Sequence, residues 1–348
     1  MKKIEQCRAG LSRRLTRTNK VIVFVLLILS FAGSWLWMDY QSALNQPALV
    51  GQTVYIEIEK GDSLNRIIGK LVDQKLAVKP FWFKVIALQD NALKKLKTGE
   101  YELISGLTVP QIIALFVQGK TKQHAITFPE GWSFKDILHE LEKNPNIEHS
   151  LNGVGLERVM SKLKSDAQSP EGLLFPDTYF FEKHTSDLSL LKRAHDKMQQ
   201  VLQQEWLNKA EDLPFKTPYE ALTLASIVEK ETGAAAERPL IAGVFIRRLE
   251  QNMLLQTDPT VIYGMGDSYQ GDIKAKDLTT ATPYNTYVIS GLPPTPIAMP
   301  GRDALYAVLH PDKGESLYFV ARGDGTHVFS ATLEDHTKAV DSFQRNKK

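Results

Sequence analysis

The hydrophobic positions near the start of the chain form one unbroken run. Val21 to Met38 reads VIVFVLLILSFAGSWLWM and contains no charged residue. At about 1.5 Å of rise per residue, a helix of this length reaches roughly 27 Å, which is close to the hydrocarbon thickness of a bilayer. Trp35, Trp37 and Tyr40 stand at its far end, where interfacial aromatic residues are expected. We predict that residues 21–38 form a transmembrane helix.

After this run the pattern changes to short alternating and helical segments. Val54, Ile56 and Ile58 alternate on one face of a predicted strand, and Gly61-Asp62-Ser63 supplies a turn and a helix cap. The pattern predicts a small αβ unit that ends near Lys122. Its expected elements are strand 53–59, helix 64–71, helix 80–88, strand 99–103 and helix 108–117.

The rest of the chain restarts with a strand, a turn and a helix, and then becomes richer in helices and loops. Expected elements are strand 124–128, helix 133–141, a loop-rich middle at 145–185, helix 187–210, a largely helical segment 217–251 broken near Gly233, strands 317–321 and 327–330, and helix 333–343. Residues 257–301 are expected to form long ordered loops, which often carry function. The predicted fold class is therefore α+β: an N-terminal transmembrane helix, a small αβ domain, and a larger mixed α/β domain with long ordered loops.

The formal net charge of +2 conceals a strong asymmetry. Residues 1–20 hold seven basic residues and one acid, whereas the body of the chain is net negative. The positive-inside rule places this basic flank in the cytoplasm and the body in the periplasm or outside, as a single-pass protein of the cytoplasmic (inner) membrane. A net negative body argues against binding to nucleic acid. A signal peptide with a cleavage site at Ser30-Phe31-Ala32 is the alternative, and residues 39–52 are expected to form a short stalk.

The segment Thr217 to Gly233, TPYEALTLASIVEKETG, carries an acid in an unusual place. Capping signals at both ends predict a helix of about 15 residues. At about 100° per residue, Glu231 falls roughly 20° from Leu224, inside the apolar stripe, whereas Glu229 falls roughly 140° away on the polar side. Burial and the negative end of the helix dipole raise the pKa of a carboxyl group placed like Glu231. Such a group suits the proton transfer of glycosidic-bond cleavage.

Helical geometry alone leaves alternatives open for these acids. Glu231 could instead form an ion pair with Arg247 or Arg248 of the next helix. Asp258 either supplies a second carboxylate or caps amides of its own turn. Glu229 is expected to be a solvated surface acid or a residue that supports Glu231 without touching substrate, and Arg247 is a second such supporting residue. The histidines are scattered without metal-ligand spacing, so neither a metal nor another cofactor is expected.

Several sequence blocks resemble the signatures of the YceG-like family, the membrane-anchored endolytic murein transglycosylases. The most informative block is ASIVEKET at 225–232. The others, in chain order, are EGWS at 130–133, FPDTY at 175–179, VFIRRL at 244–249, LQTDPTVIYG at 255–264, PYNTY at 283–287 and GLPP at 291–294. The resemblance covers about residues 50–345.

This resemblance implies that Glu231, the second Glu of ASIVEKET, is the catalytic acid. It implies a LysM-like domain at 53–122 and a catalytic domain at 123–348. The implied reaction is endolytic cleavage of the β-1,4 bond between N-acetylmuramic acid and N-acetylglucosamine in nascent peptidoglycan, leaving 1,6-anhydro ends. Glu231 would first protonate the leaving oxygen and then act as base on the muramyl C6 hydroxyl. A partnership with peptidoglycan synthases at the membrane is also implied.

Amide groups and aromatic faces suit glycans, so polar and aromatic residues of these blocks are expected to contact the sugar: Gln256, Asp258, Tyr263, Tyr284, Asn285 and Tyr287. Two other functions stay open. A lysozyme-like peptidoglycan hydrolase would pair Glu231 with Asp258, because hydrolysis normally needs a second carboxylate. A non-catalytic wall-binding scaffold would use the LysM-like unit and keep the second domain only as structure.

Overall fold

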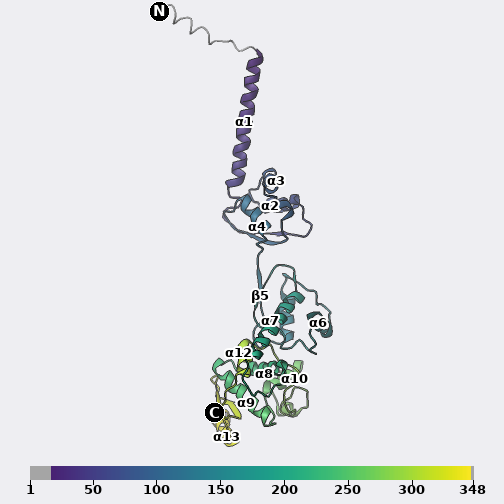
Figure 1. The fold of residues 1–348 in the computed structure, drawn as a ribbon, viewed down its shortest axis with the longest axis vertical. Helices are drawn as coiled ribbons and strands as arrows, with labels where there is room; N and C mark the ends of the chain where they lie inside the picture. Colours follow the sequence, from purple (N-terminus) through teal and green to yellow (C-terminus); the bar gives the residue numbers. More distant parts are fainter. Residues whose placement is uncertain (1–16, 346–348) are drawn as a thin grey trace, which may run out of the picture. The chain divides into compact units, whose positions relative to one another are not determined.

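The computed structural model describes residues 17–345, drawn as a ribbon in Figure 1. The chain divides into two compact units, with the division between Lys122 and Gln123. Most of the predicted basic flank, residues 1–16, and the last three residues of the predicted catalytic domain lie outside the described residues.

The first element is a single long helix, α1 (Arg17–Asn45), which contains the whole predicted apolar run. The most apolar 18-residue stretch of its segment Lys20–Asn45 has a mean hydropathy of 2.3, and none of that stretch is buried. By length and composition this helix could cross a membrane.

Residues 39–52 do not form the expected stalk. They continue α1 to Asn45, and Ala48 and Leu49 then enter the core of the small unit with 2% and 3% of their surfaces exposed. The Ala48 amide donates to the Leu107 carbonyl at 2.7 Å. The prediction of a stalk is wrong because Ala48 and Leu49 fill a core that distant residues build.

The small unit contains a two-stranded antiparallel ribbon and three helices, α2 (Leu64–Asp73), α3 (Pro80–Gln89) and α4 (Val109–Gln118). Strands β1 (Val54–Ile58) and β2 (Gly99–Leu103) pair along their whole length. The core includes Tyr101 and Phe116, whose rings meet edge to face at 4.7 Å. Here the local pattern predicted both strands and the three α-helices, because each one buries a regular apolar face, and it missed the 3₁₀ turn at Ala92–Lys94.

The large unit combines helices with short strands. Its strands are β3 (His124–Thr127), β4 (Ile147–Glu148), β5 (Thr178–Phe181), β6 (Thr185–Ser186), β7 (Tyr318–Ala321) and β8 (His327–Ser330). Its helices are α5 (Phe134–Lys143), α6 (Leu156–Leu163), α7 (Asp187–Leu207), α8 (Pro218–Glu231), α9 (Arg238–Glu250), α10 (Asp258–Met265), α11 (Ala275–Thr279), α12 (Arg302–Leu309) and α13 (Leu333–Val340).

Strand pairing in the large unit stays local. The described strands form three separate two-stranded ribbons, β3 with β5, β4 with β6, and β7 with β8, and only the β4–β6 pair is parallel. The unit therefore mixes helix and strand, as predicted, with helices supplying most of its core. Helices α6 and α10 lie where loops were expected. Helix α6 carries a periodic signal that the sequence reasoning missed, with Val159, Met160 and Leu163 buried at helical spacing, whereas the eight-residue α10 has little apolar periodicity.

Helix α8 occupies the centre of this core. Eight consecutive residues, Ala221 to Val228, are buried, and α7, α9, α10 and α12 contact the helix. Pro218 stands at its first position, and the Thr217 hydroxyl accepts a hydrogen bond from the Glu220 amide, as the capping signals predicted. Residues 221–228 therefore have no solvated face. Lys230 in the last turn is exposed, so the surroundings of Glu229 and Glu231 depend on the segments that pack beside that turn.

A tight loop contact at Gly172 predicts a mutation with a measurable cost. Gly172 has a φ of 76°, and a Cβ there would lie 2.4 Å from Cβ of Pro296. We expect Gly172→Ala to combine backbone strain with steric overlap. Gly153, with a φ of 72° and open space around it, is the matched control for strain alone. Chemical unfolding should show Gly172→Ala to be about 1–3 kcal/mol more destabilising than Gly153→Ala; equal losses would contradict the overlap.

Candidate active site

Glu231 is the last residue of α8 and lines a cleft of about 440 Å³. The cleft is built from the end of α8, the segment 255–258, α9, the β7–β8 ribbon and α13. Its polar and aromatic lining includes Arg248, Gln256, Asp258, Tyr287, Tyr318 and His327. The side chain predicted to face the apolar side of its helix thus reaches a cleft wall.

The carboxyl group of Glu231 is placed to hold a proton near neutral pH. Burial raises the pKa of Glu231 to about 7; a hydrogen bond from the Thr257 hydroxyl opposes this increase. The charge of Asp258 raises the pKa of Glu231 further, and His327 lowers it. Within residues 17–345, neither Arg247 nor Arg248 forms an ion pair with Glu231. The alternative in which Glu231 pairs with one of these arginines is therefore wrong.

Thr257 belongs to a buried threonine cluster that fixes the cleft wall. Its amide donates to the hydroxyl of Thr286 at 3.1 Å, and the hydroxyls of Thr260 and Thr286 lie 2.8 Å apart. This cluster joins the start of α10 to residues 285–287. The preceding residue, Gln256, has a φ of 52°, a left-handed conformation uncommon outside glycine, and its exposed side chain lines the cleft.

Asp258 and Tyr287 form a hydrogen-bonded pair in the same cleft. The Tyr287 hydroxyl donates to Oδ1 of Asp258 at 2.7 Å, and burial, with this hydrogen bond, raises the pKa of Tyr287. Asp258 is the first residue of α10 and its side chain is exposed. The alternative in which Asp258 only caps local amides is wrong, because its carboxylate accepts a hydrogen bond from the hydroxyl of Tyr287, in a distant segment.

A carboxylate–histidine pair stands on another wall of the cleft. Nδ1 of His327 lies 2.7 Å from Oε2 of Glu237, and the His327 amide donates to Oε1 of the same carboxylate at 2.9 Å. A carboxylate can only accept here, so Nδ1 carries the proton. Nε2 has no hydrogen-bond partner among residues 17–345 and belongs to a ring that lines the cleft.

The two arginines of α9 have different surroundings from those expected. Arg247 donates to the backbone carbonyls of Asp312 and Ser316, away from the cleft lining. Arg248 lines the cleft and donates to the Leu255 carbonyl at 2.9 Å. Of the two neighbours, Arg248 is therefore the one that supports the cleft wall, and Arg247 does not contact Glu231.

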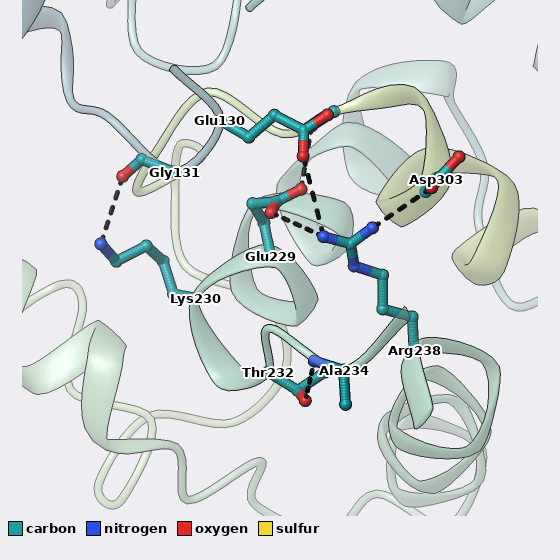
Figure 2. A network of polar contacts seen from close by, with 9 residues as sticks. Glu130, Gly131, Glu229, Lys230, Thr232, Ala234, Arg238 and Asp303 are labelled. Carbon is teal, nitrogen blue, oxygen red and sulfur yellow. Dashed lines mark hydrogen bonds and ion pairs between the residues drawn. The ribbon is translucent and has the colours of Figure 1, made fainter. Parts of the chain in front are cut away.

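Glu229 is not the solvated acid that helical phase suggested. Its side chain is 6% exposed and lies 3.2 Å from the Arg238 guanidinium, which Glu130 and Asp303 also approach (Figure 2). Oε2 of Glu229 accepts from the Gly301 amide at 3.0 Å. Burial raises the pKa of Glu229, and the Gly301 and Arg238 interactions oppose this. The solvated alternative for Glu229 is wrong because Arg238 and the Gly301 amide, from distant segments, cover this side of the helix end.

Three of the predicted sugar contacts lie outside the cleft lining. Asn285 is 1% exposed and its amide nitrogen donates to three backbone carbonyls, so it holds a loop together. Tyr263 donates to Oε2 of Glu171 at 3.1 Å, and Tyr284 packs on Tyr263 with ring centroids 4.8 Å apart. Burial raises the pKa of Glu171 to about 7. Asn285 is thus a structural residue, and the two tyrosines belong to a separate buried cluster.

Sequence reasoning missed Arg248 and His327 as lining residues of the cleft, and it missed Thr257 and Glu237 as the partners of Glu231 and His327. Thr257 had a local signal, because a Thr directly before Asp-Pro is a typical helix N-cap. His327 and Glu237 are 90 residues apart and had none. Among the described residues, no group of three or more His, Cys, Asp or Glu is arranged to hold a metal ion.

Known proteins of one family are similar to this chain over most of its length. The model of the YceG-like family matches residues 56–342. A Bacillus subtilis (strain 168) protein named endolytic murein transglycosylase is 31% identical over 319 residues, with 85% of this chain and 86% of that protein covered. A protein of the same name from Streptococcus pneumoniae serotype 2 is 28% identical, and the match covers 91% of this chain and 63% of that protein.

A 2.6 Å crystal structure of a yceG-like protein from Listeria monocytogenes is 28% identical in sequence. The match covers 83% of this chain and 99% of that one, with a TM-score of 0.48. The family match and the Bacillus relative each extend over most of the sequence, so this chain belongs to the YceG-like family.

Proposed function

We propose that this chain is a peptidoglycan lytic transglycosylase that cuts within nascent glycan strands, with Glu231 as its catalytic residue. The observation that carries the proposal is a carboxyl group at a cleft wall whose pKa burial raises to about 7. The family relationship, and the name endolytic murein transglycosylase of its relatives, supply the substrate class.

The proposed reaction needs one carboxyl group and no water. Glu231 donates its proton to the oxygen between the N-acetylmuramic acid and N-acetylglucosamine rings, and the bond from muramyl C1 to that oxygen breaks. The N-acetylglucosamine end leaves with a new hydroxyl. The Glu231 carboxylate then takes the proton of the muramyl C6 hydroxyl, whose oxygen bonds to C1 and closes a 1,6-anhydro ring. Glu231 ends protonated, ready for another cycle.

Other residues of the cleft have proposed roles in holding the glycan. Gln256 and the Asp258–Tyr287 pair offer hydrogen-bonding groups at the wall next to Glu231. His327, oriented by Glu237, presents Nε2 to a sugar hydroxyl or amide. Asp258 also keeps the lysozyme-like hydrolase as a rival function, because it could act as a second carboxylate.

The ion pair of Glu229 and Arg238 is proposed to hold the last turn of α8, and so to position Glu231 without contacting substrate. The pair ties the last turn of α8 to the start of α9, and Glu130 and Asp303 extend the connection to the 130–133 turn and α12 (Figure 2). A carboxyl group at a helix end would otherwise move as that end frays.

The remaining parts of the proposal concern the setting of the reaction. We propose that α1 anchors the chain in the cytoplasmic membrane with residues 1–20 inside the cell, and that the small domain is LysM-like and binds glycan. The order β1–α2–α3–β2 of the small domain is compatible with this reading. We further propose that this chain acts next to peptidoglycan synthases, because both would use the same glycan strands at the membrane surface.

The variant Glu231→Gln tests the catalytic role. It keeps the shape of the side chain but cannot donate or accept the reaction's proton, so cleavage of isolated sacculi should fall by at least about 10²-fold. Folding and binding to sacculi should be unchanged. Mass analysis of wild-type products should find anhydro-muramyl ends; reducing ends would identify a hydrolase, and full cleavage by the variant would exclude Glu231 as the acid.

The pH dependence of cleavage gives a second test. Glu231 must be protonated to act as the acid, so activity should be retained below its pKa of about 7 and should fall as the pH rises through that value. The variant Asp258→Asn removes a charge that raises this pKa, so its falling limb should move to lower pH. Thr257→Val removes a hydrogen bond that lowers it and should act oppositely. Shifts in one direction for both variants would contradict the assignment.

The variant Arg238→Met tests the ion pair between Glu229 and Arg238 at the end of α8. It leaves Glu229 buried without its cation, which should reduce the free energy of unfolding by about 3–5 kcal/mol. The double variant Glu229→Gln with Arg238→Met should recover much of this loss, because no buried charge is left unpaired. Chemical unfolding curves measure both; additive losses in the double variant would contradict the pairing.

A further inference from the structure

We propose that α3, together with the end of α1, forms a lipid-binding surface that holds the small domain against the membrane. The occupant is the interfacial region of the phospholipid bilayer that α1 crosses. The inference rests on the proposed role of α1 as an anchor and adds a second, independent contact with the same bilayer.

The depth of α3 is set by its contacts with Asp39. The apolar run of α1 ends at Met38, and Asp39 is the first charged residue after it. Nε1 of Trp82 donates to Oδ2 of Asp39 at 2.6 Å, and the Lys79 ammonium pairs with the other oxygen of the carboxylate. Because one residue of helix rises only about 1.5 Å, the start of α3 lies at the end of the hydrocarbon-spanning segment.

The C-terminal end of α3 contacts the same turn of α1, next to Asp39. The Tyr40 hydroxyl donates to Oε1 of Gln89 at 2.8 Å, and the Tyr40 ring lies 5.1 Å from that of Trp82. A ten-residue helix is about 15 Å long, whereas Asp39 and Tyr40 are neighbours in α1. Helix α3 therefore crosses the end of α1, and Figure 1 draws it on the side of the small domain from which α1 extends.

The outward face of α3 is apolar and uncovered. Phe81 and Leu88 are 64% and 58% exposed, and their spacing of seven residues puts them on one face of the helix. The opposite face, with Phe83 and Ile86, is buried in the core of the small domain. Lys84 is exposed between the two apolar residues, where its ammonium can reach lipid phosphates while its stem stays apolar.

This face continues the aromatic end of the membrane helix. The rings run from Phe81 to Trp82 at 4.8 Å, on to Tyr40, and from Tyr40 to Trp37 at 6.2 Å. Trp37 itself is 63% exposed at the end of the apolar run. Aromatic rings gather at the membrane–water interface. Continuity with the helix that enters the bilayer identifies lipid, rather than a protein partner, as the occupant.

Site-specific labelling in a bilayer tests this surface. The full chain carries one cysteine, Cys7, so a Cys7→Ser background accepts single cysteines at chosen sites. Phe81→Cys and Leu88→Cys probe the surface. Tyr55→Cys is the matched control, because Tyr55 is 46% exposed and packs on Lys122, where the chain leaves the small domain. Ile28→Cys, inside the apolar run, reports on the anchor.

Each variant is labelled with a fluorophore and reconstituted in vesicles of phosphatidylethanolamine and phosphatidylglycerol. Labels at 81 and 88 should show several-fold weaker quenching by aqueous iodide than the label at 55. Lipids with a nitroxide near the headgroup should quench them strongly. Equal iodide quenching at 81, 88 and 55 would overturn the proposal, as would protection that grows with the protein-to-lipid ratio, since that would indicate a second copy.

The label at 28 separates this inference from the proposed anchor. Lipid quenching at 28 together with water-exposed labels at 81 and 88 would overturn the lipid-binding surface alone. A water-exposed label at 28 would overturn the anchor and this surface together.

Discussion

The large unit depends on one constraint: residues 221–228 of α8 are buried on all sides, and the last turn of this helix carries two acids. Ala221, Ala225 and Ser226 are small enough for neighbouring helices to approach, and the Ser226 hydroxyl both donates within α8 and accepts from the Ile297 amide. Two charged carboxylates buried at this helix end would be unstable without partners or protons. One is neutralised by a buried arginine, and the other reaches a cleft where burial favours its protonated form.

The surroundings of Glu229 and Glu231 differ in the partners that each carboxyl group has. Glu229 has an arginine and a backbone amide, so it can stay charged and hold the helix end in place. Glu231 has a single hydroxyl donor and a nearby like charge, which leaves its proton available to a substrate. The same helix therefore carries an ion-paired carboxylate and a carboxyl group whose pKa is raised to about 7, two residues apart. Their environments, not their residue type, make them different.

Local sequence predicted much of the fold where each element buries one regular face. The small domain followed its apolar periodicity closely, and β8 was predicted at its observed bounds. Failures fell on elements whose burial comes from distant partners. Ala48 and Leu49 sit in a polar-looking connector but fill a core, and α10 was hidden by its own Pro and Gly residues within a long loop region.

By itself, the sequence determined the apolar N-terminal helix, the capped helix that carries ASIVEKET and the position of Glu231 on the apolar side of that helix, because charge pattern and helical phase are local quantities. Only the tertiary structure decided which groups share the cleft with it. Asp258, Tyr287 and His327 come from three separate segments, and three expected sugar contacts, Tyr263, Tyr284 and Asn285, lie elsewhere. Side chains from distant segments meet only when the core between them has packed, and no local pattern records that packing.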